Sequence, residues 1–366
     1  LNICSQSFKF MNTITRDQKI YFSLYYALFG FSVMIIFSQI QFPESFTPSF
    51  FLISIFLACS VAGLSLGNYI YHIMGIAATL DHPAYFNAMA QGNAFVGVIT
   101  AVLTIILDFS CKKEVFDEYL TNEMVVVTDQ EMVGGILFGF GFVLLVSNLW
   151  AYKNLKKVTN SDQKETKNSD NDNEDQILLH NQSKNTQPTI FETIKTNLSI
   201  LKLCKFHLGS ICLDYIITFS LYPFIPQRTV SQCRLEVNED SFYCGIINLS
   251  PGFYVLVFCF LLFNFGDWLG RYSSKMMPNF LKFEEKKKFL MFTFCRLFIG
   301  LLFFLTPRDN YDGYQMFSNV NISDYLFQII MIIFAWSHGF VAGKGIGFAP
   351  ANCRTGQEMD VCGGLV

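Results

Sequence analysis

The sequence predicts an all-α polytopic membrane protein, a bundle of transmembrane helices, and three observations favour this fold class. Among 366 residues, 52% are hydrophobic and only 15% are charged, whereas soluble domains carry about 25% charged residues. The 41 Phe are spread over long apolar runs, so most elements are apolar on every side, as helices that face lipid are. The longest runs reach the about 20 residues with which a helix crosses the hydrocarbon core.

Eight runs satisfy this length, and each is interpreted as one membrane-spanning helix. The second run exceeds the needed length, so its helix is expected to tilt or to break near Gly63 and Gly67. Glycines in this run and the next, Gly92 and Gly97 among them, also let helices approach closely. The expected spans are Ile20 to Gln41, Phe50 to Leu80, Tyr85 to Leu107, Met132 to Ala151, Leu203 to Ile225, Phe253 to Arg271, Phe289 to Thr306 and Tyr325 to Phe348.

A hydrophilic stretch separates the fourth span from the fifth. From Lys156 to Thr189 the chain is rich in Asn, Asp, Lys, Gln and Ser and almost lacks aromatic residues, so it cannot bury enough apolar surface to fold alone. We therefore expect an N-terminal half over residues 1–155, a disordered linker over 156–198 and a C-terminal half over 199–366. The sequence begins without Met and without a signal-peptide pattern, and it ends in an apolar stretch. We therefore expect it to be a fragment.

The distribution of charge predicts the orientation and the partners. Lysines collect beside the linker, at Lys153 and Lys156, and between the sixth and seventh spans, at Lys286 to Lys288. By the positive-inside rule this side is cytosolic, so the linker is cytosolic. A net charge of −3 lacks the concentrated basic face that nucleic acid requires. The expected partner is the lipid bilayer, of the plasma membrane rather than an internal membrane, and the oligomeric state stays open.

The sixth span carries the strongest candidate for a functional site. In FNFGDWLGR, Asn264, Asp267 and Arg271 follow one another at i, i+3 and i+7 and share one helical face. Asp267 and Arg271 can pair, which lowers the free-energy cost of holding each charge away from water. The face either lines a cavity where these groups bind a polar solute, or forms a structural ion pair with Arg271 reaching the cytosolic interface.

Other ionisable groups within the spans favour packing roles. Asp214 in the fifth span and Arg296 in the seventh are interpreted as a structural pair. His72 and His338 are lone histidines in apolar surroundings, for which a hydrogen-bonded packing role is commoner than proton relay.

The cysteines and the known catalytic motifs give no sign of a metal, a cofactor or an enzyme. The 11 Cys show no paired C-x-x-C spacing, and most are interpreted as small buried apolar residues. Cys233 and Cys244, in a loop expected outside the cell, form either a disulfide or two thiols. No nucleophile triad, zinc motif or phosphate-binding glycine loop is visible, so a non-enzymatic protein is expected.

The string FNFGDWLGRY, from Phe263 to Tyr272, resembles the signature helix of the equilibrative nucleoside transporters, where Asn and then Asp-Trp-Leu-Gly-Arg recur in the eighth of eleven spans. The similarity extends over the rest of the chain outside the linker. The fifth family helix is resembled by Pro83 with Tyr85, Gly92 and Gly97, and the seventh by Pro223. The ninth is resembled by Cys295-Arg296-Leu297 with Thr306-Pro307-Arg308, and the tenth by Ser337-His338-Gly339-Phe340 with Pro350.

On this resemblance, the eight spans correspond to family helices three to ten, and the chain is truncated at both ends. The resemblance implies a major-facilitator-like bundle of two pseudo-symmetric halves around a central cavity. It also implies that Asp267 and Arg271 contact the ribose hydroxyls, with Asn264 beside them. The fourth family helix often supplies a Gln that contacts the nucleobase, and in this sequence Asn68 and Tyr69 are the expected substitutes for it.

The expected function is therefore facilitative transport of nucleosides by alternating access, with each side of the membrane exposed in turn. Without an ATP-binding motif or a clear ion site, transport is expected to run downhill. The alternatives are a transporter of the same fold for nucleobases or another small polar or cationic solute, and a membrane receptor or scaffold that does not transport.

Overall fold

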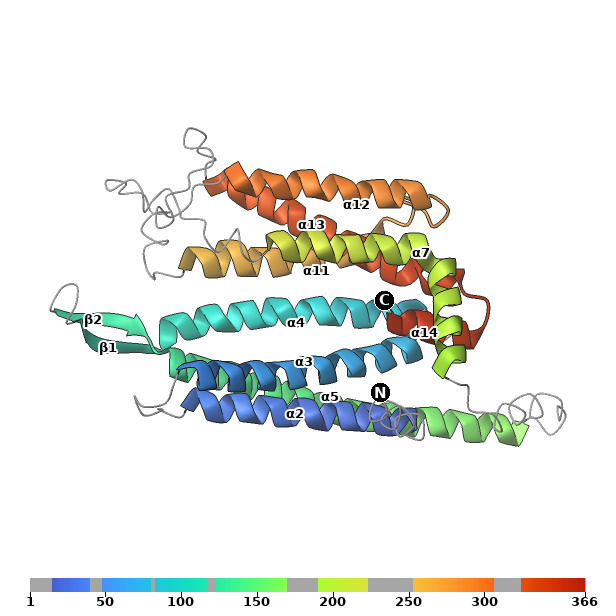
Figure 1. The fold of residues 1–366 in the computed structure, drawn as a ribbon, viewed down its shortest axis with the longest axis horizontal. Helices are drawn as coiled ribbons and strands as arrows, with labels where there is room; N and C mark the ends of the chain where they lie inside the picture. The colour runs from blue at the N-terminus through green and yellow to red at the C-terminus, as the bar shows by residue number, and fades with distance from the viewer. Residues whose placement is uncertain are drawn as a thin grey trace. The chain divides into compact units, whose positions relative to one another are not determined.

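The computed structural model describes residues 15–39, 48–79, 83–117, 123–169, 190–222, 253–305 and 324–365. Nearly all of these residues are helical, as Figure 1 shows. Contacts between residues divide the chain into two compact units. The first comprises Leu1–Ile73 and Gly134–Ser199, and the second comprises Met74–Val133 and Ile200–Val366.

The first unit contains α2 (Arg16–Gln39), most of α3 (Pro48–Thr79) and most of α5 (Gln130–Ser169). Its packing combines small residues with aromatic ones. A Cβ added at Gly30 would lie 2.9 Å from the Cβ of Ala62, so α2 and α3 approach closely there. The rings of Phe31 and Phe138 meet edge to face, with centroids 6.4 Å apart.

The second unit contains the end of α3, the start of α5, all but the first ten residues of α7, and the other elements. A π-helical segment, η1, leads directly into α11 without a break in the helix. The elements are α4 (Pro83–Ser110), β1 (Lys112–Asp117), β2 (Glu123–Thr128), α7 (Ile190–Leu221), η1 (Val255–Leu261), α11 (Leu262–Met276), α12 (Lys286–Leu301), the 3-10 turns η2 (Leu302–Leu305) and η4 (Pro350–Asn352), α13 (Asp324–Phe348) and α14 (Gly356–Leu365).

The two strands form an antiparallel hairpin in which Lys112 pairs with Thr128 and Asp117 with Glu123. The hairpin was not expected from the sequence, because the membrane-span pattern says nothing of the short segments between spans. It joins α4 to α5, and Asp129, directly after β2, hydrogen-bonds to the amide of Met132 in the first turn of α5.

Glycines allow α11 and α13 to pack with their backbones in contact. A Cβ added at Gly270 would lie 2.1 Å from the carbonyl oxygen of Trp336, and one at Gly339 would lie 1.9 Å from that of Asp267. Gly266 and Gly343 are also too close to the other helix to carry a side chain without movement. Pairs of small residues four apart on both helices are the usual basis of such close crossings in membranes.

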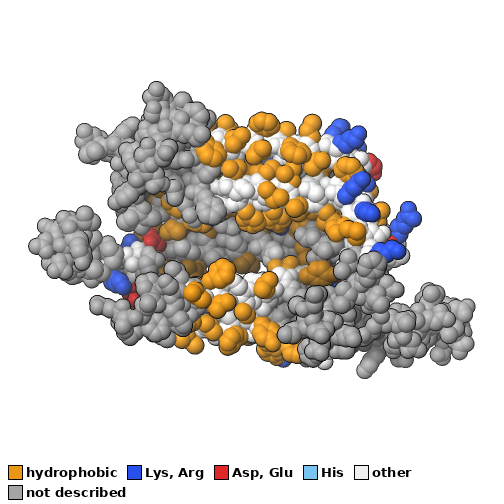
Figure 2. Space-filling view, in the orientation of Figure 1, with side chains coloured by type: hydrophobic (Ala, Val, Ile, Leu, Met, Phe, Trp, Pro, Cys, Tyr) orange, Lys and Arg blue, Asp and Glu red, His pale blue; other side chains and the backbone are white. Residues whose placement is uncertain are grey.

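The expected all-α polytopic membrane fold is confirmed, and every expected span falls largely on a helix. Among the described residues, six helices are long and apolar enough to cross a membrane. The helices α7 and α12 are not among these six. α7 carries the charged residues Lys202, Lys205 and Asp214, and α12 has only 16 residues and begins with three lysines. Figure 2 shows hydrophobic side chains over much of the visible face of the helices, with most of the visible Lys and Arg at the end where α12 begins and a few more at the opposite end.

The expected domain boundaries differ from the division observed in the contacts. Residues 74–133, assigned from the sequence to the N-terminal half, pack with the C-terminal elements. The expected linker, 156–198, is helical at both ends, because α5 continues to Ser169 and α7 begins at Ile190. Its middle lies outside the described residues, as do Cys233, Cys244 and Pro223.

The glycines expected to promote helix packing behave differently from one another. A Cβ added at Gly97 would lie 2.2 Å from Oδ1 of Asn264, so this glycine does permit a close approach between α4 and α11. At Gly63, Gly67 and Gly92, an added Cβ would meet no atom of the described residues within 4 Å. Single apolar spans cannot reveal which face of a helix meets a neighbour, so the sequence did not show which of these glycines lies at a close helix contact.

Candidate functional site

The centre of the candidate site is an ion pair on α11. Nε of Arg271 donates to both carboxylate oxygens of Asp267, at 3.1 and 3.2 Å. Both residues are about nine-tenths buried, and they lie four apart on one helical face, as the sequence predicts. The pairing itself is therefore confirmed, and each charge has its compensating partner inside the unit.

The neighbours of Arg271 come from two further helices of the same unit. Its Nη1 lies 3.5 Å from the carbonyl oxygen of Ala90 on α4. The hydroxyl of Tyr215, on α7, also interacts with the guanidinium group. Arg271 thus connects α11 with α4 and α7, while Nε stays committed to the carboxylate.

The third residue of the predicted face, Asn264, is oriented by its own helix. Its Nδ2 donates to the carbonyl oxygen of Phe260, 2.8 Å away, which leaves Oδ1 directed at Gly97. The acceptor atom of Asn264 therefore lies against Gly97 of α4. The three predicted residues lie on α11, two turns of helix from first to last.

A second buried ion pair lies beside the first. Asp214 on α7 and Arg296 on α12 contact each other and are 0% and 1% exposed. Arg296 also donates to the hydroxyl of Thr218 and to that of Ser337, each at 3.0 Å. The predicted structural pair is confirmed, and the network joins α7, α12 and α13.

His338, on α13, lies between the two ion pairs. Its Nδ1 is 2.8 Å from Oδ2 of Asp214, and its Nε2 is 3.9 Å from Oδ1 of Asp267. The ring of Phe263 stacks on the imidazole with centroids 6.0 Å apart. The hydrogen-bonded packing role expected for His338 is confirmed. Its surroundings are charged and not apolar, because α7, distant in the sequence, brings Asp214 to it.

The two substitutes for the nucleobase ligand belong to the first unit. Nδ2 of Asn68 donates to Oγ of Ser23 on α2 at 2.6 Å, a contact that holds α2 against α3. Tyr69, the next residue, is partly buried. Asn68 thus has a packing contact within the first unit. Neither Asn68 nor Tyr69 belongs to the unit that contains the α11 residues of the candidate site.

The chemistry available in this arrangement is hydrogen bonding. A carboxylate offers about four lone-pair positions and a guanidinium five donors, more than Arg271 Nε and Asp267 use on each other. Sequence reasoning missed three contributors: Tyr215, Thr218 and Ser337. An apolar span with a hydroxyl group looks ordinary in the sequence, and only the packing of α7 and α13 shows that these hydroxyls meet buried charges.

The fold and this network define a class, an integral multi-pass membrane protein with charged groups held inside its helix bundle. The chain matches the family model described as "Nucleoside transporter" over residues 57–366. It is also similar to equilibrative nucleoside transporter 1 of Mus musculus, with 26% identity over 162 residues, and of Rattus norvegicus, with 24% over 160 residues.

The chain therefore belongs to the nucleoside transporter family. The stretch shared with the mouse and rat proteins covers 43% of this chain and 31% of each relative. The family model matches residues 57–366, a range that includes both the α11 pair and the network around His338.

Proposed function

We propose that the protein carries nucleosides across the plasma membrane without catalysing a reaction. Asp267 and Arg271 bind the ribose hydroxyls, and Asn264 lies beside them. The observation that carries the proposal is the buried Asp267–Arg271 pair, whose members keep hydrogen-bonding capacity beyond the bond they share. Two adjacent hydroxyls match such a pair, since each can donate to the carboxylate and accept from the guanidinium.

The transport proposed here is downhill and proceeds by alternating access, in which the site opens to each side in turn. Asn68 and Tyr69 are proposed to contribute to binding of the base, in addition to the contact of Asn68 with Ser23. Family membership supports the nucleoside as solute, and the chemistry of the pair supports the ribose as the part recognised.

The test is uptake of labelled adenosine and uridine by the full-length protein in cells that lack nucleoside transport. Saturable uptake that stops at equal concentrations inside and outside is expected. Asp267→Asn should abolish it at equal surface abundance. Glu285→Gln, which removes an exposed pair with Lys288, is the matched control and should leave uptake unchanged.

Competition separates the ribose from the base as the recognised part. A 2′,3′-dideoxynucleoside should compete at least about tenfold more weakly than the nucleoside, because each hydrogen bond to a charged group contributes about 1.5–3 kcal/mol. Equal competition by a free nucleobase would assign the carrier to nucleobases instead. Absence of uptake of either nucleoside, with the protein at the surface, would contradict the proposal as a whole.

A further inference from the structure

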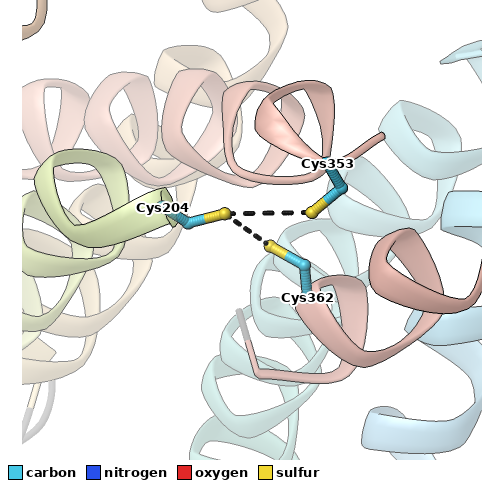
Figure 3. Close-up of side chains that lie close together, drawn as sticks. All are labelled: Cys204, Cys353 and Cys362. Atoms are coloured by element: carbon cyan, nitrogen blue, oxygen red, sulfur yellow. Dashed lines mark hydrogen bonds between the residues drawn. The ribbon is translucent and has the colours of Figure 1, made fainter. Parts of the chain in front are cut away.

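Three cysteines from separate elements meet at one point in the second unit. Cys204 lies on α7, Cys353 directly follows η4, and Cys362 lies on α14 (Figure 3). Sγ of Cys204 is 3.9 Å from Sγ of Cys353 and 3.4 Å from Sγ of Cys362. All three sulfurs lie within 4.8 Å of one another and point toward a common centre.

The surroundings of the three sulfurs are apolar and closed to water. Cys204, Cys353 and Cys362 are 1%, 7% and 0% exposed. They pack in one cluster with the buried side chains of Ile200 and Ala349. All three are thiols, and burial raises the pKa of Cys353 to about 12.

We propose that Cys204, Cys353 and Cys362 bind a single thiophilic metal ion, Cu(I), in a trigonal site. Three sulfurs at the usual metal–thiolate distance of about 2.3 Å lie about 4.0 Å from one another around a central ion. The observed separations of 3.9 and 3.4 Å need only small side-chain rotations to reach this arrangement. On binding, three thiol protons leave to solvent and three Cu–S bonds form, and the copper remains Cu(I).

The donor set decides between candidate ions. Among the described residues, no His, Asp or Glu joins the three sulfurs within the same distance. Structural Zn(II) sites are almost always tetrahedral with four ligands, whereas three soft thiolates in a dry site suit Cu(I). The cluster lies at the lysine-rich end of the helices, which we expect to be cytosolic, where thiols stay reduced.

The site would link α7 to η4 and α14, which are distant from it in the sequence. Cys353 and Cys362 flank the first turns of α14, and Cys204 belongs to α7, which also carries Asp214. A bound ion would hold α14 against α7 and the end of α13. This stabilising role is independent of the solute that the protein carries, so it stands or falls separately from the proposed function.

The experiment uses purified, reduced full-length protein offered Cu(I) under anaerobic conditions against a bicinchoninate competitor. We expect about one copper per chain by mass spectrometry, and X-ray absorption should show three sulfurs at about 2.3 Å. Each of the substitutions Cys204→Ser, Cys353→Ser and Cys362→Ser should lower the copper retained at least tenfold. Cys212→Ser, which changes an exposed cysteine on the same helix α7, is the control and should retain it.

A second measurement needs no variant, in case a substitution prevents folding. Cu(I) should raise the unfolding temperature of the unaltered protein, because the ion binds the folded state, and an excess of bicinchoninate should reverse the rise. Several results would overturn the proposal: no copper retained, copper retained equally by Cys204→Ser, or a disulfide between Cys204 and Cys362 in reduced, purified protein. Retention of Zn(II) in place of Cu(I) would overturn the choice of metal.

Discussion

Gly339 on α13 lies so close to Asp267 on α11 that a Cβ at position 339 would be 1.9 Å from the Asp267 carbonyl oxygen. This contact brings the two helices together at the level of the ion pair. Gly270 lies against Trp336, Gly339 and Phe340 in the same way from the other helix. The position of the Asp267 carboxylate therefore depends on a glycine that bears no functional group.

Gly339→Ala is expected to destabilise the second unit by about 1–3 kcal/mol or to prevent its assembly, because the added methyl meets backbone atoms that cannot rotate away. Thermal unfolding of the purified protein, followed by size-exclusion chromatography, measures the change. Gly347→Ala is the matched control on the same helix, because a Cβ there meets no described atom within 4 Å. Equal unfolding temperatures for the two variants would show that the helices separate easily.

Arg296→Met is expected to destabilise the protein by about 3–5 kcal/mol, because it leaves the carboxylate of Asp214 buried without its partner. The double variant Arg296→Met with Asp214→Asn should recover much of that loss, since it removes the uncompensated charge. Unfolding temperatures of the two single variants and the double variant measure the coupling between the residues. Additive losses would show that the pair contributes no mutual stabilisation.

His338→Ala is expected to lower both stability and uptake. It removes the donor to Asp214 and the ring on which Phe263 stacks, a loss of about 2–4 kcal/mol from a hydrogen bond to a charge and a small cavity. His338→Asn keeps a donor group and should lose less. Unfolding temperature, surface abundance and the KM for nucleoside distinguish the effects.

A raised KM at normal stability in His338→Asn would show that the imidazole orients Asp267 across the 3.9 Å gap. An unchanged KM in both variants would restrict His338 to packing and to the Asp214 pair. The measurement thus separates a positioning residue from a structural one.

The start of α5 is expected to loosen in acid. The amide of Met132 and the ammonium group of Lys113 bond to the Asp129 carboxylate and lower its pKa below the ordinary value. Because the folded-state pKa lies below the unfolded value of about 3.9, this stabilisation is present above that pH. It is lost as the pH falls through the folded-state pKa.

Hydrogen exchange of the Met132 and Val133 amides, corrected for intrinsic rates, measures this effect between pH 7 and about pH 3. The acid-dependent increase should disappear in Asp129→Asn, which keeps a capping side chain but carries no charge. Glu285→Gln, at a different helix start, should leave the increase unchanged. An increase that persists in Asp129→Asn would assign it to another group.

The sequence by itself determined the class of fold, the placement of the eight expected spans on helices and the pairing of Asp267 with Arg271. Long apolar runs and i, i+4 spacing are local properties, and a lipid environment requires helices wherever such runs occur. Asp214 and Arg296 could be recognised as a structural pair before their contact was seen, because an ionisable side chain inside a membrane span needs a compensating partner.

Only the tertiary structure decided which residues surround those charges. His338 acquires its neighbour Asp214 from a helix more than a hundred residues away in the sequence. Cys204 likewise meets Cys353 and Cys362, which are also more than a hundred residues away from it. The close approach of α11 and α13 likewise depends on which faces of two apolar helices meet. Helices that are apolar all round carry no periodic signal for their packed face, so packing of small residues, and not hydrophobic pattern, selects these contacts.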